Sequence, residues 1–186
     1  MVTNDTQVQN VVGTKEGRIF LAGHDSLFEV LYQTGNWFRG PKCEKQNLSK
    51  NYLSSFIPAI SFLSNVEEIR LISVDDTRHY LYTLGDKGTI EVYDLGADGL
   101  KLERKKSSSL LDIRREIRST CGVEDEFLAG IVAINAIPST RSQYVCLEAV
   151  TTKGMRIYFT VYPNLVPNYP IEQQDARAST LLKFMV

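Results

Sequence analysis

Cysteine and histidine are scarce in this sequence of 186 residues, which contains three cysteines and two histidines. Cys43, Cys121 and Cys146 are odd in number and far apart, whereas disulfide frameworks use paired cysteines and structural zinc sites use closely spaced ligands. Neither His24 nor His79 has cysteine or carboxylate neighbours at the spacing of a metal site. We therefore expect no bound metal or other cofactor, and a reducing compartment such as the cytosol or nucleus.

Short motifs of catalysis and nucleotide binding are also missing. The phosphate-cradling patterns GxGxxG and GxxxxGK(S/T) do not occur, and neither does the nucleophile elbow GxSxG. Asp75 and Asp76 are adjacent carboxylates, but Thr77 and Arg78 follow them, and this run is typical of a turn. The sequence therefore predicts a non-enzymatic protein without a small-molecule substrate.

Long apolar runs and a strong charge of one sign are absent as well. The most apolar stretch, residues 128–137, is about half as long as a membrane span requires. Residues 1–7 are polar and have neither the basic nor the apolar part of a secretory signal. The formal net charge of −1 gives no overall attraction to nucleic acid. We expect neither membrane insertion nor secretion nor nucleic-acid binding.

The sequence does contain a series of short β-strand patterns separated by turn residues. Over residues 89–93, apolar Ile90 and Val92 alternate with polar neighbours, and this period of two buries one face of a strand. Runs of the same kind are bounded by Gly and Asp, as in the turn at residues 85–88. The expected strands cover residues 17–23, 27–32, 69–74, 80–84, 89–93, 100–104, 130–137, 144–150 and 155–162, with a last apolar run at 181–186.

These strands fall into three units. Phe28, Ile90 and Ile157 occupy equivalent core positions, and they lie 62 and 67 residues apart. Four-stranded units that recur along a chain are typical of β-propeller blades, and a closed propeller has about four to eight of them. We therefore expect an all-β fold, a partial propeller arc of about three blades that is either a fragment of a longer protein or completed by a partner. The blade-like units span about residues 11–48, 69–105 and 128–186.

Residues 107–122 break the β pattern and are expected to form a short amphipathic helix between blades. Ser109 and Asp112 resemble a capping box at its start, and Gly122 is a suitable stop. At about 100° per residue, the apolar side chains fall on one narrow stripe with arginines along one flank. The stripe consists of Leu110, Ile113, Ile117 and Cys121, and the flanking residues are Arg114 and Arg118.

The charge of this region leaves two interpretations of the helix open. Between Lys101 and Arg118 there are seven basic residues against three acidic ones. Such a segment suits an anionic membrane surface, where each basic residue contributes about 1 kcal/mol. In the other interpretation, the apolar stripe packs on the side of the propeller. The residues expected to contact a membrane are Leu110, Ile113, Arg114, Ile117 and Arg118.

Several stretches of the sequence form an ordered set: GRIFLAG at 17–23, LFEVLY at 27–32, WF at 37–38, KCEK at 42–45, VDDTR at 74–78, LYT at 81–83, KGTIEVYDL at 87–95 and, more weakly, GMRIYF at 154–159. Together they resemble the N-terminal β-propeller of one family, the one-hundred-and-fifty-five-kilodalton inner-ring nucleoporins of the nuclear pore. No single stretch is specific to this family, but the whole set is specific when its order and spacing are included. Where this sequence has the helix, the family has a loop that resembles a lipid-packing sensor, although this segment is more charged.

The resemblance implies a seven-bladed propeller followed by a long α-helical solenoid, in a scaffold that contacts other inner-ring nucleoporins. It also implies a structural constituent of the nuclear pore complex at the nuclear envelope, which contributes to pore assembly and to nucleocytoplasmic transport of protein and mRNA. The alternative is a soluble propeller-type adaptor for protein–protein interaction that is unrelated to the pore.

Overall fold

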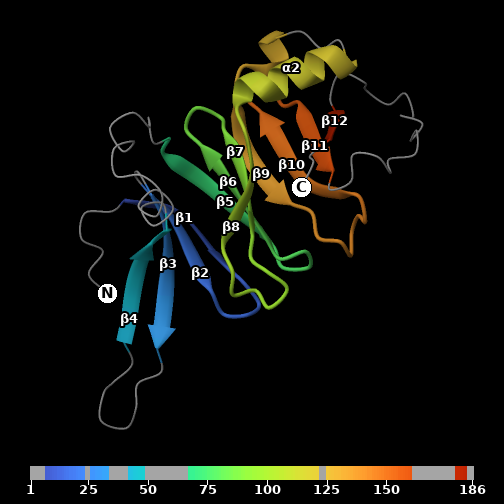
Figure 1. Cartoon of the computed structure of the whole chain (residues 1–186). Helices are drawn as coiled ribbons and strands as arrows, with labels where there is room; N and C mark the ends of the chain where they lie inside the picture. Colours follow the sequence, from blue (N-terminus) through green and yellow to red (C-terminus); the bar gives the residue numbers. More distant parts are fainter. Residues whose placement is uncertain are drawn as a thin grey trace.

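The computed structural model describes residues 7–23, 26–33, 42–48, 67–121, 125–160 and 179–183. Strands dominate these residues, and they form three sheets of four strands each that lie side by side (Figure 1). The expected all-β architecture is therefore confirmed. Within the same residues, no helix is long and apolar enough to cross a membrane.

Each sheet uses strands that are consecutive in the chain. The first contains β1 (Val8–Gly13), β2 (Ile19–Gly23), β3 (Ser26–Gln33) and β4 (Lys42–Asn47). The second contains β5 (Ile69–Asp75), β6 (Tyr80–Gly85), β7 (Ile90–Asp94) and β8 (Glu103–Ser108). The third contains β9 (Ile131–Ala136), β10 (Val145–Thr151), β11 (Arg156–Thr160) and β12 (Ser179–Lys183). Neighbouring strands of the third sheet pair antiparallel except β11 and β12, which run parallel.

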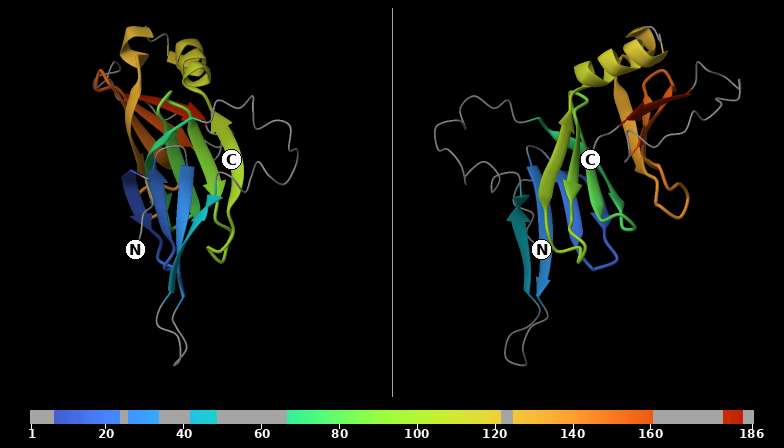
Figure 2. Two further views of the ribbon diagram at one scale, coloured as in Figure 1. Left: turned by 90° about the vertical axis from the view of Figure 1, so that its left-hand side faces the viewer. Right: turned by 45° about the vertical axis from the view of Figure 1, so that its right-hand side comes forward.

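The first strand of each sheet joins that sheet to the next. Strand β1 contacts β5, and β5 contacts β9, so the sheets follow one another in chain order (Figure 2). A side chain completes each junction with a hydrogen bond to the neighbouring backbone. The Ile72 amide donates to Asn10 Oδ1 over 3.3 Å, and the Ala136 amide donates to Ser73 Oγ over 2.9 Å.

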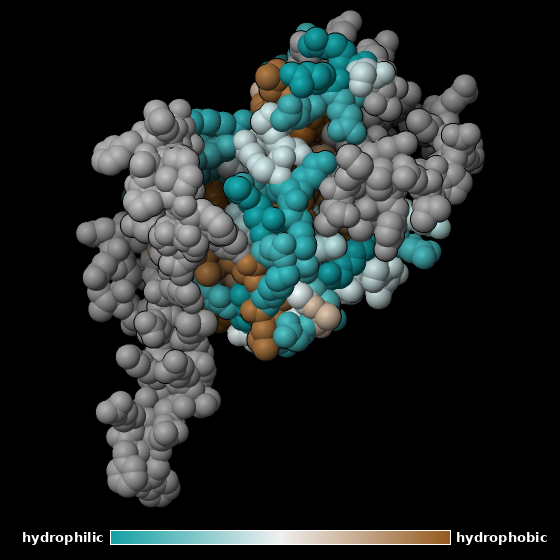
Figure 3. Space-filling view, viewed as in Figure 1, coloured by the Kyte–Doolittle hydropathy of each residue, from teal (hydrophilic) through white to brown (hydrophobic). Residues whose placement is uncertain are grey.

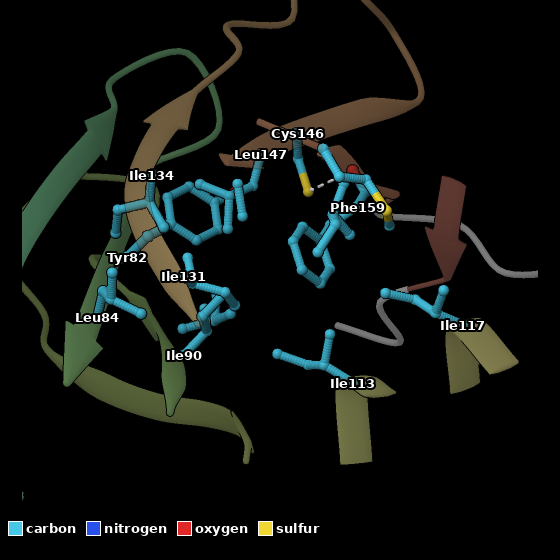
Figure 4. Close-up of a cluster of buried hydrophobic side chains, with 14 of the residues drawn as sticks. Tyr82, Leu84, Ile90, Ile113, Ile117, Ile131, Ile134, Cys146, Leu147 and Phe159 are labelled. Carbon is cyan, nitrogen blue, oxygen red and sulfur yellow. Dashed lines mark hydrogen bonds between the residues drawn. The ribbon is translucent and has the colours of Figure 1, made fainter. Parts of the chain in front are cut away.

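Two apolar clusters fill the spaces between the sheets. Because side chains alternate along a strand, each sheet can present one apolar face to its neighbour. The cluster between the first and second sheets includes Phe20, Leu27 and Leu81. The cluster between the second and third sheets includes Ile90 and Phe159 and also receives side chains from the helix (Figure 4). Each such fully buried side chain contributes about 1.5–3 kcal/mol, so burial between sheets is a main stabilising contribution.

The strand and helix bounds differ from the sequence prediction near residue 107. The strand expected at 100–104 lies instead at β8 (Glu103–Ser108), and the helix begins at Leu110, as α2 (Leu110–Cys121). Ser107 and Ser108 were expected in the helix, but both pair with β7 and extend the second sheet. The backbone ladder therefore overrides the local helical pattern at these two residues.

Two further strands, β1 and β4, are absent from the predicted set. Both contain several polar residues, VQNVVG and KCEKQN, and they occupy the two edges of the first sheet. A short 3-10 helix, η1 (Asp125–Leu128), precedes β9. Expected features that lie outside the described residues are the turn residues at 24–25, the aromatic pair at 37–38, the helix stop at 122 and the chain end at 184–186.

Candidate functional site

Strand β8 and helix α2 form the most strongly charged part of the sequence, and we call residues 101–118 the basic edge surface. Strand β8 is the outer strand of the second sheet, and α2 follows it after one residue. Figure 3 shows a hydrophilic band over β8 that continues toward the helix. This surface is the candidate site because it combines charge, exposure and an amphipathic helix.

Carboxylates inside and outside the basic edge surface neutralise part of its charge. Lys101 and Lys105 both pair with Glu103, and Lys105 Nζ is also 3.7 Å from Asp94 Oδ2. Hydrogen bonds from Lys101 and then Lys105 lower the pKa of Glu103. Arg104 Nη1 lies 3.0 Å from Glu91 Oε1. The net positive charge of the basic edge surface is therefore lower than the residue count along the sequence indicates, because β7 supplies two anionic partners, Glu91 and Asp94.

A reciprocal pair of side chains starts helix α2, as the sequence predicts. Ser109 Oγ donates to Asp112 Oδ2 over 2.6 Å, and the Asp112 amide donates to Ser109 Oγ over 3.2 Å. The Ser109 amide also donates to Asp112 Oδ2 over 3.3 Å, which completes the capping box. The two hydrogen bonds that the Ser109 hydroxyl and amide donate favour the ionised carboxylate and lower the pKa of Asp112. The predicted cap is confirmed.

The apolar stripe of α2 faces the protein. Ile113 and Ile117 are 2% and 0% exposed, and they project into the core between the second and third sheets, near Phe159 (Figure 4). Leu110 is half-buried against the same core. In this structure the stripe therefore packs on the propeller side, which is one of the two expected arrangements. Membrane contact by the helix stays a prediction.

The two flanking arginines of the stripe have different surroundings. Arg114 is partly buried, and its guanidinium donates to the Leu128 carbonyl over 2.7 Å and to the Ala129 carbonyl over 2.8 Å. Arg114 therefore ties α2 to the segment that leads into β9. Arg118 is exposed on the helix surface. The sequence predicts the same environment for both arginines, but in the structure Arg114 binds backbone carbonyls of the protein itself.

The outward side of α2 combines an apolar side chain with cations. Leu111 is 63% exposed, and the Arg115 side chain is 71% exposed. Arg115 Nη1 lies 3.4 Å from Asp112 Oδ1, and this exposed pair contributes little to stability. Leu111 and Arg115 are outside the predicted contact set because they lie off the apolar stripe.

Arginine side chains also connect neighbouring sheets, which the sequence does not predict. Arg18, in the turn before β2, pairs with the buried Glu29 over 2.6 Å. Its Nη1 then donates to the carbonyls of Gly99 and Lys101 of the second sheet's last loop, each over 2.7 Å. The first and second sheets are therefore joined by a guanidinium as well as by their apolar cluster.

Arg78 makes an equivalent connection from the second sheet to the third. Its Nη1 lies 2.6 Å from the buried Asp75 Oδ2 and donates to the Ile137 carbonyl over 2.7 Å. Its Nη2 donates to the Ser142 carbonyl. Asp75 Oδ1 also accepts from the Thr77 hydroxyl and amide. Asp75 is therefore part of a turn, as the sequence predicts, and of an inter-sheet junction, which the sequence does not predict.

The histidine and cysteine side chains that the structure describes are those of His79 and Cys146. Over the described ranges, no group of three or more His, Cys, Asp or Glu side chains is arranged to hold a metal ion. His79 lies in a turn with φ 57°, and its Nδ1 is 3.9 Å from Glu16 Oε1. Burial raises the pKa of the Cys146 thiol to about 11. That thiol is a poor nucleophile near neutral pH.

Comparison with known proteins places the chain among nuclear pore proteins. The family model described as "Nup133 N terminal like" matches residues 1–184. Nuclear pore complex protein Nup154 of Drosophila melanogaster is 32% identical over 162 residues, and nucleoporin NUP170 of Chaetomium thermophilum is 34% identical over 164 residues. These matches cover 85% and 83% of this chain but only 12% and 11% of the relatives.

A solved structure has the same architecture. The crystal structure of the Chaetomium thermophilum Nup170 NTD–Nup53 complex aligns with a TM-score of 0.68 and 28% sequence identity. The alignment covers 89% of this chain and 23% of that chain. The three sheets therefore correspond to part of a larger domain in this neighbour.

Proposed function

Because the chain belongs to the nucleoporin family described as Nup133 N-terminal-like, we propose that it serves as a scaffold segment of the nuclear pore complex. In this proposal it is a fragment of an N-terminal β-propeller, with its three sheets as blades, and it functions at the nuclear envelope. The observation that carries the proposal is the family match over residues 1–184, together with three successive four-stranded sheets.

In the proposed mechanism the chain presents a rigid binding surface to its partners and carries out no covalent chemistry. Arg18 and Arg78 join each sheet to the next through buried carboxylates and backbone carbonyls. Such charge-assisted hydrogen bonds are about twice as strong as neutral ones, so they resist relative movement of the sheets. A scaffold needs this property because its partners must meet a surface of constant shape.

We infer that its partners are other nucleoporins of the inner ring. The relative Nup170 was solved as an NTD–Nup53 complex, and the chain aligns with that domain over most of its own length. A nucleoporin similar to Nup53 is therefore the first partner to test. The alternative, a soluble propeller-type adaptor unrelated to the pore, predicts no such binding.

A pull-down with a purified Nup53-type nucleoporin tests this function. We expect the parent chain and a Lys153→Ala control to be retained, because Lys153 is an exposed turn residue. The Arg78→Ala variant should be retained less, because its second and third sheets lose a junction. A fluorescently tagged chain should also collect at the nuclear rim. Diffuse signal together with no retention of the parent would favour the adaptor.

We further propose that the outward side of α2 touches the anionic pore membrane. Leu111 is 63% exposed there, and Arg115 and Arg118 are exposed on the same helix. Apolar insertion and Coulomb attraction together are what an interfacial helix uses. Ile113 and Ile117 would then anchor the helix to the propeller while the opposite side meets lipid.

Flotation with phosphatidylserine-containing liposomes tests the membrane contact. Leu111→Asp should abolish flotation of the parent chain, because it removes the exposed apolar group and adds a negative charge. Leu100→Asp is the matched control, since Leu100 is 70% exposed but lies outside the helix. Equal flotation of the two variants, or no flotation of the parent, would contradict membrane contact. Aspartate at Ile113 or Ile117 is unsuitable because a buried charge would unfold the chain.

A further inference from the structure

Three consecutive serines follow three consecutive cations at the end of β8. The sequence reads Arg-Lys-Lys-Ser-Ser-Ser over residues 104–109. Protein kinases select substrates partly by charge, and those with an acidic substrate cleft favour cations shortly before the accepting hydroxyl. The segment therefore has the charge pattern of a phosphoacceptor, but the sequence leaves three hydroxyls to choose from.

The structure distinguishes these three hydroxyls. Ser109 Oγ is engaged with Asp112 in the capping box of α2. Ser108 pairs with the buried Ile90 of β7 and is itself half-buried. Ser107 is exposed and pairs with Glu91. Among the residues that the structure describes, none is hydrogen-bonded to the Ser107 hydroxyl, so this is the accessible acceptor.

The backbone at Ser107 also suits recognition by a kinase. Strand β8 is the outer strand of its sheet, and within the described part of the chain it pairs with β7 alone. An edge strand is already extended and keeps one row of backbone groups unpaired. Arg104, three residues before Ser107, has a side chain that is 58% exposed. Its surface pair with Glu91 contributes only about 0–1 kcal/mol, so a kinase carboxylate can compete for it.

We propose that Ser107 is a phosphorylation site for a serine kinase that selects basic substrates, with ATP as the phosphoryl donor. The Ser107 Oγ attacks the γ-phosphorus, a new P–O bond forms, and the bond between the γ-phosphorus and the β–γ bridging oxygen breaks. ADP leaves with that oxygen, and the hydroxyl proton passes to the catalytic base of the kinase. The product is phosphoserine, which carries about −1.5 to −2 charges at neutral pH.

The location of Ser107 gives this modification a local consequence. Its cross-strand partner is Glu91, and like charges directly opposite each other destabilise a strand pair. Arg104 pairs with Glu91 in the unmodified chain and would be shared with the phosphate. Phosphorylation therefore weakens the pairing of β8 with β7 and lowers the positive charge of the basic edge surface.

The test is phosphorylation of the intact, folded chain by the catalytic subunit of cyclic-AMP-dependent protein kinase with ATP, followed by mass spectrometric site mapping. We expect one phosphoryl group, located on Ser107. Ser107→Ala should abolish its incorporation, whereas the matched variant Ser108→Ala should incorporate it like the parent. Arg104→Gln should slow incorporation by about tenfold, the order expected for one lost charge-assisted contact.

Hydrogen exchange supplies a second readout. The amides of β8 should exchange faster in the phosphorylated chain than in the unmodified chain, while those of β10, in the third sheet, stay unchanged. Phosphate that maps to Ser108 or Ser109, or that enters the Ser107→Ala variant at the parent rate, would overturn the proposal. Absence of incorporation into the parent would do the same. The site depends on β8 and not on pore assembly, so the pull-down with a Nup53-type nucleoporin tests a separate claim.

Discussion

At the residue scale, loss of the Arg78 side chain should lower the stability of the fold strongly. Asp75 is 1% exposed and has Arg78 as its cation at 2.6 Å. Arg78→Ala leaves that carboxylate buried without its cation, although Thr77 still donates to it, so the free energy of unfolding should fall by about 3–5 kcal/mol in urea titration. Arg156→Ala is the control and should have little effect, because the Arg156 side chain is 62% exposed and lies 3.5 Å from Glu148 in a surface pair. Similar losses for both variants would contradict this assignment.

Cys146 should resist thiol reagents as long as the chain is folded. Its side chain is buried, its Sγ donates to the Phe159 carbonyl over 3.3 Å, and its pKa is raised to about 11, mainly by burial. Only the thiolate reacts, so labelling at pH 8 should report unfolding. The measurement needs Cys43→Ser and Cys121→Ser in the same chain. Labelling at the rate of a free thiol under native conditions would show that this region opens.

Because of the buried Cys146 thiol, the free energy of unfolding should decrease as the pH rises in the alkaline range. An unfolded cysteine has a pKa of about 8.5, and the folded Cys146 has one of about 11. The unfolded chain therefore releases this proton at a lower pH than the folded chain does. Stability is fully present below about pH 8.5 and falls as pH rises toward 11. Burial also raises the pKa of Tyr82, which lowers stability at alkaline pH in the same way. The free energy of unfolding of a Cys146→Ala variant should therefore still fall with rising pH, but less steeply than that of the parent chain.

The contacts of the two inter-sheet arginines, Arg18 and Arg78, could not be predicted from the sequence. The Ser109–Asp112 cap is local, so its pattern is visible within four residues. Arg18 and Arg78 bind carbonyls 81 and 59 residues away in the chain, at Gly99 and Ile137. Carbonyl acceptors exist at every residue, so no sequence signal identifies which ones a guanidinium reaches.

At the element scale, helix α2 should depend on its inward side chains for attachment. Ile117 is fully buried, whereas Leu111 on the same helix is 63% exposed. Ile117→Ala should lower the free energy of unfolding by about 2–5 kcal/mol because it leaves a cavity. Leu111→Ala should change it by no more than about 0.5 kcal/mol. Urea titration of both variants checks this, and comparable effects would mean that α2 is not held by its stripe.

Elements with apolar alternation were predictable, and elements at polar edges were not. Strand β7 buries Ile90 and Val92, so its period of two is visible in the sequence. Strands β4 and β8 have the compositions KCEKQN and ERKKSS, and each pairs with one neighbour in its sheet. Their position is fixed by backbone hydrogen bonds, which leave no trace in the apolar pattern. This explains why β4 is absent from the prediction and why β8 is displaced from it.

At the scale of the whole molecule, the two outer sheets present different faces away from the second sheet. On the first sheet, Val11 pairs with Leu21, and Leu21 pairs with Phe28, so one face is apolar. Val11 is 56% exposed there. On the third sheet, Glu148 accepts from Tyr158 over 3.2 Å and pairs with Arg156, so the corresponding face is polar. Leu21 and Phe28 are buried, so the exposed apolar groups of this face are Val11 and Ile19.

This asymmetry predicts which surface limits solubility. Lysine at both Val11 and Ile19, which are 56% and 38% exposed, should reduce light scattering of concentrated chain, because charge replaces the exposed apolar groups. Val132→Lys is the control, since Val132 is 50% exposed on the third sheet. Val11→Lys alone changes the net charge by the same amount as Val132→Lys, and equal improvement by these two single changes would mean that location on the first sheet does not matter.

The overall architecture was predictable to a coarser degree. Recurrence of strand patterns at 62 and 67 residues, with the family resemblance, indicated a partial propeller, and the three sheets agree with it. The direction of the last strand was not predictable. Strand β12 runs parallel to β11, whereas every other neighbouring pair is antiparallel. Periodicity identifies a strand but carries no information about its direction.

The two hydrogen bonds between first strands have a geometrical consequence. Asn10 and Ser73 each accept a hydrogen bond from a backbone amide of the following sheet. Neighbouring sheets are therefore held together at their first strands, where they lie close to each other. These hydrogen bonds act together with the Arg18 and Arg78 junctions to set the angle between neighbouring sheets. Removing either acceptor would alter the curvature of the arc, and hence the angle at which it presents its rim to a neighbour, while every individual sheet stays folded.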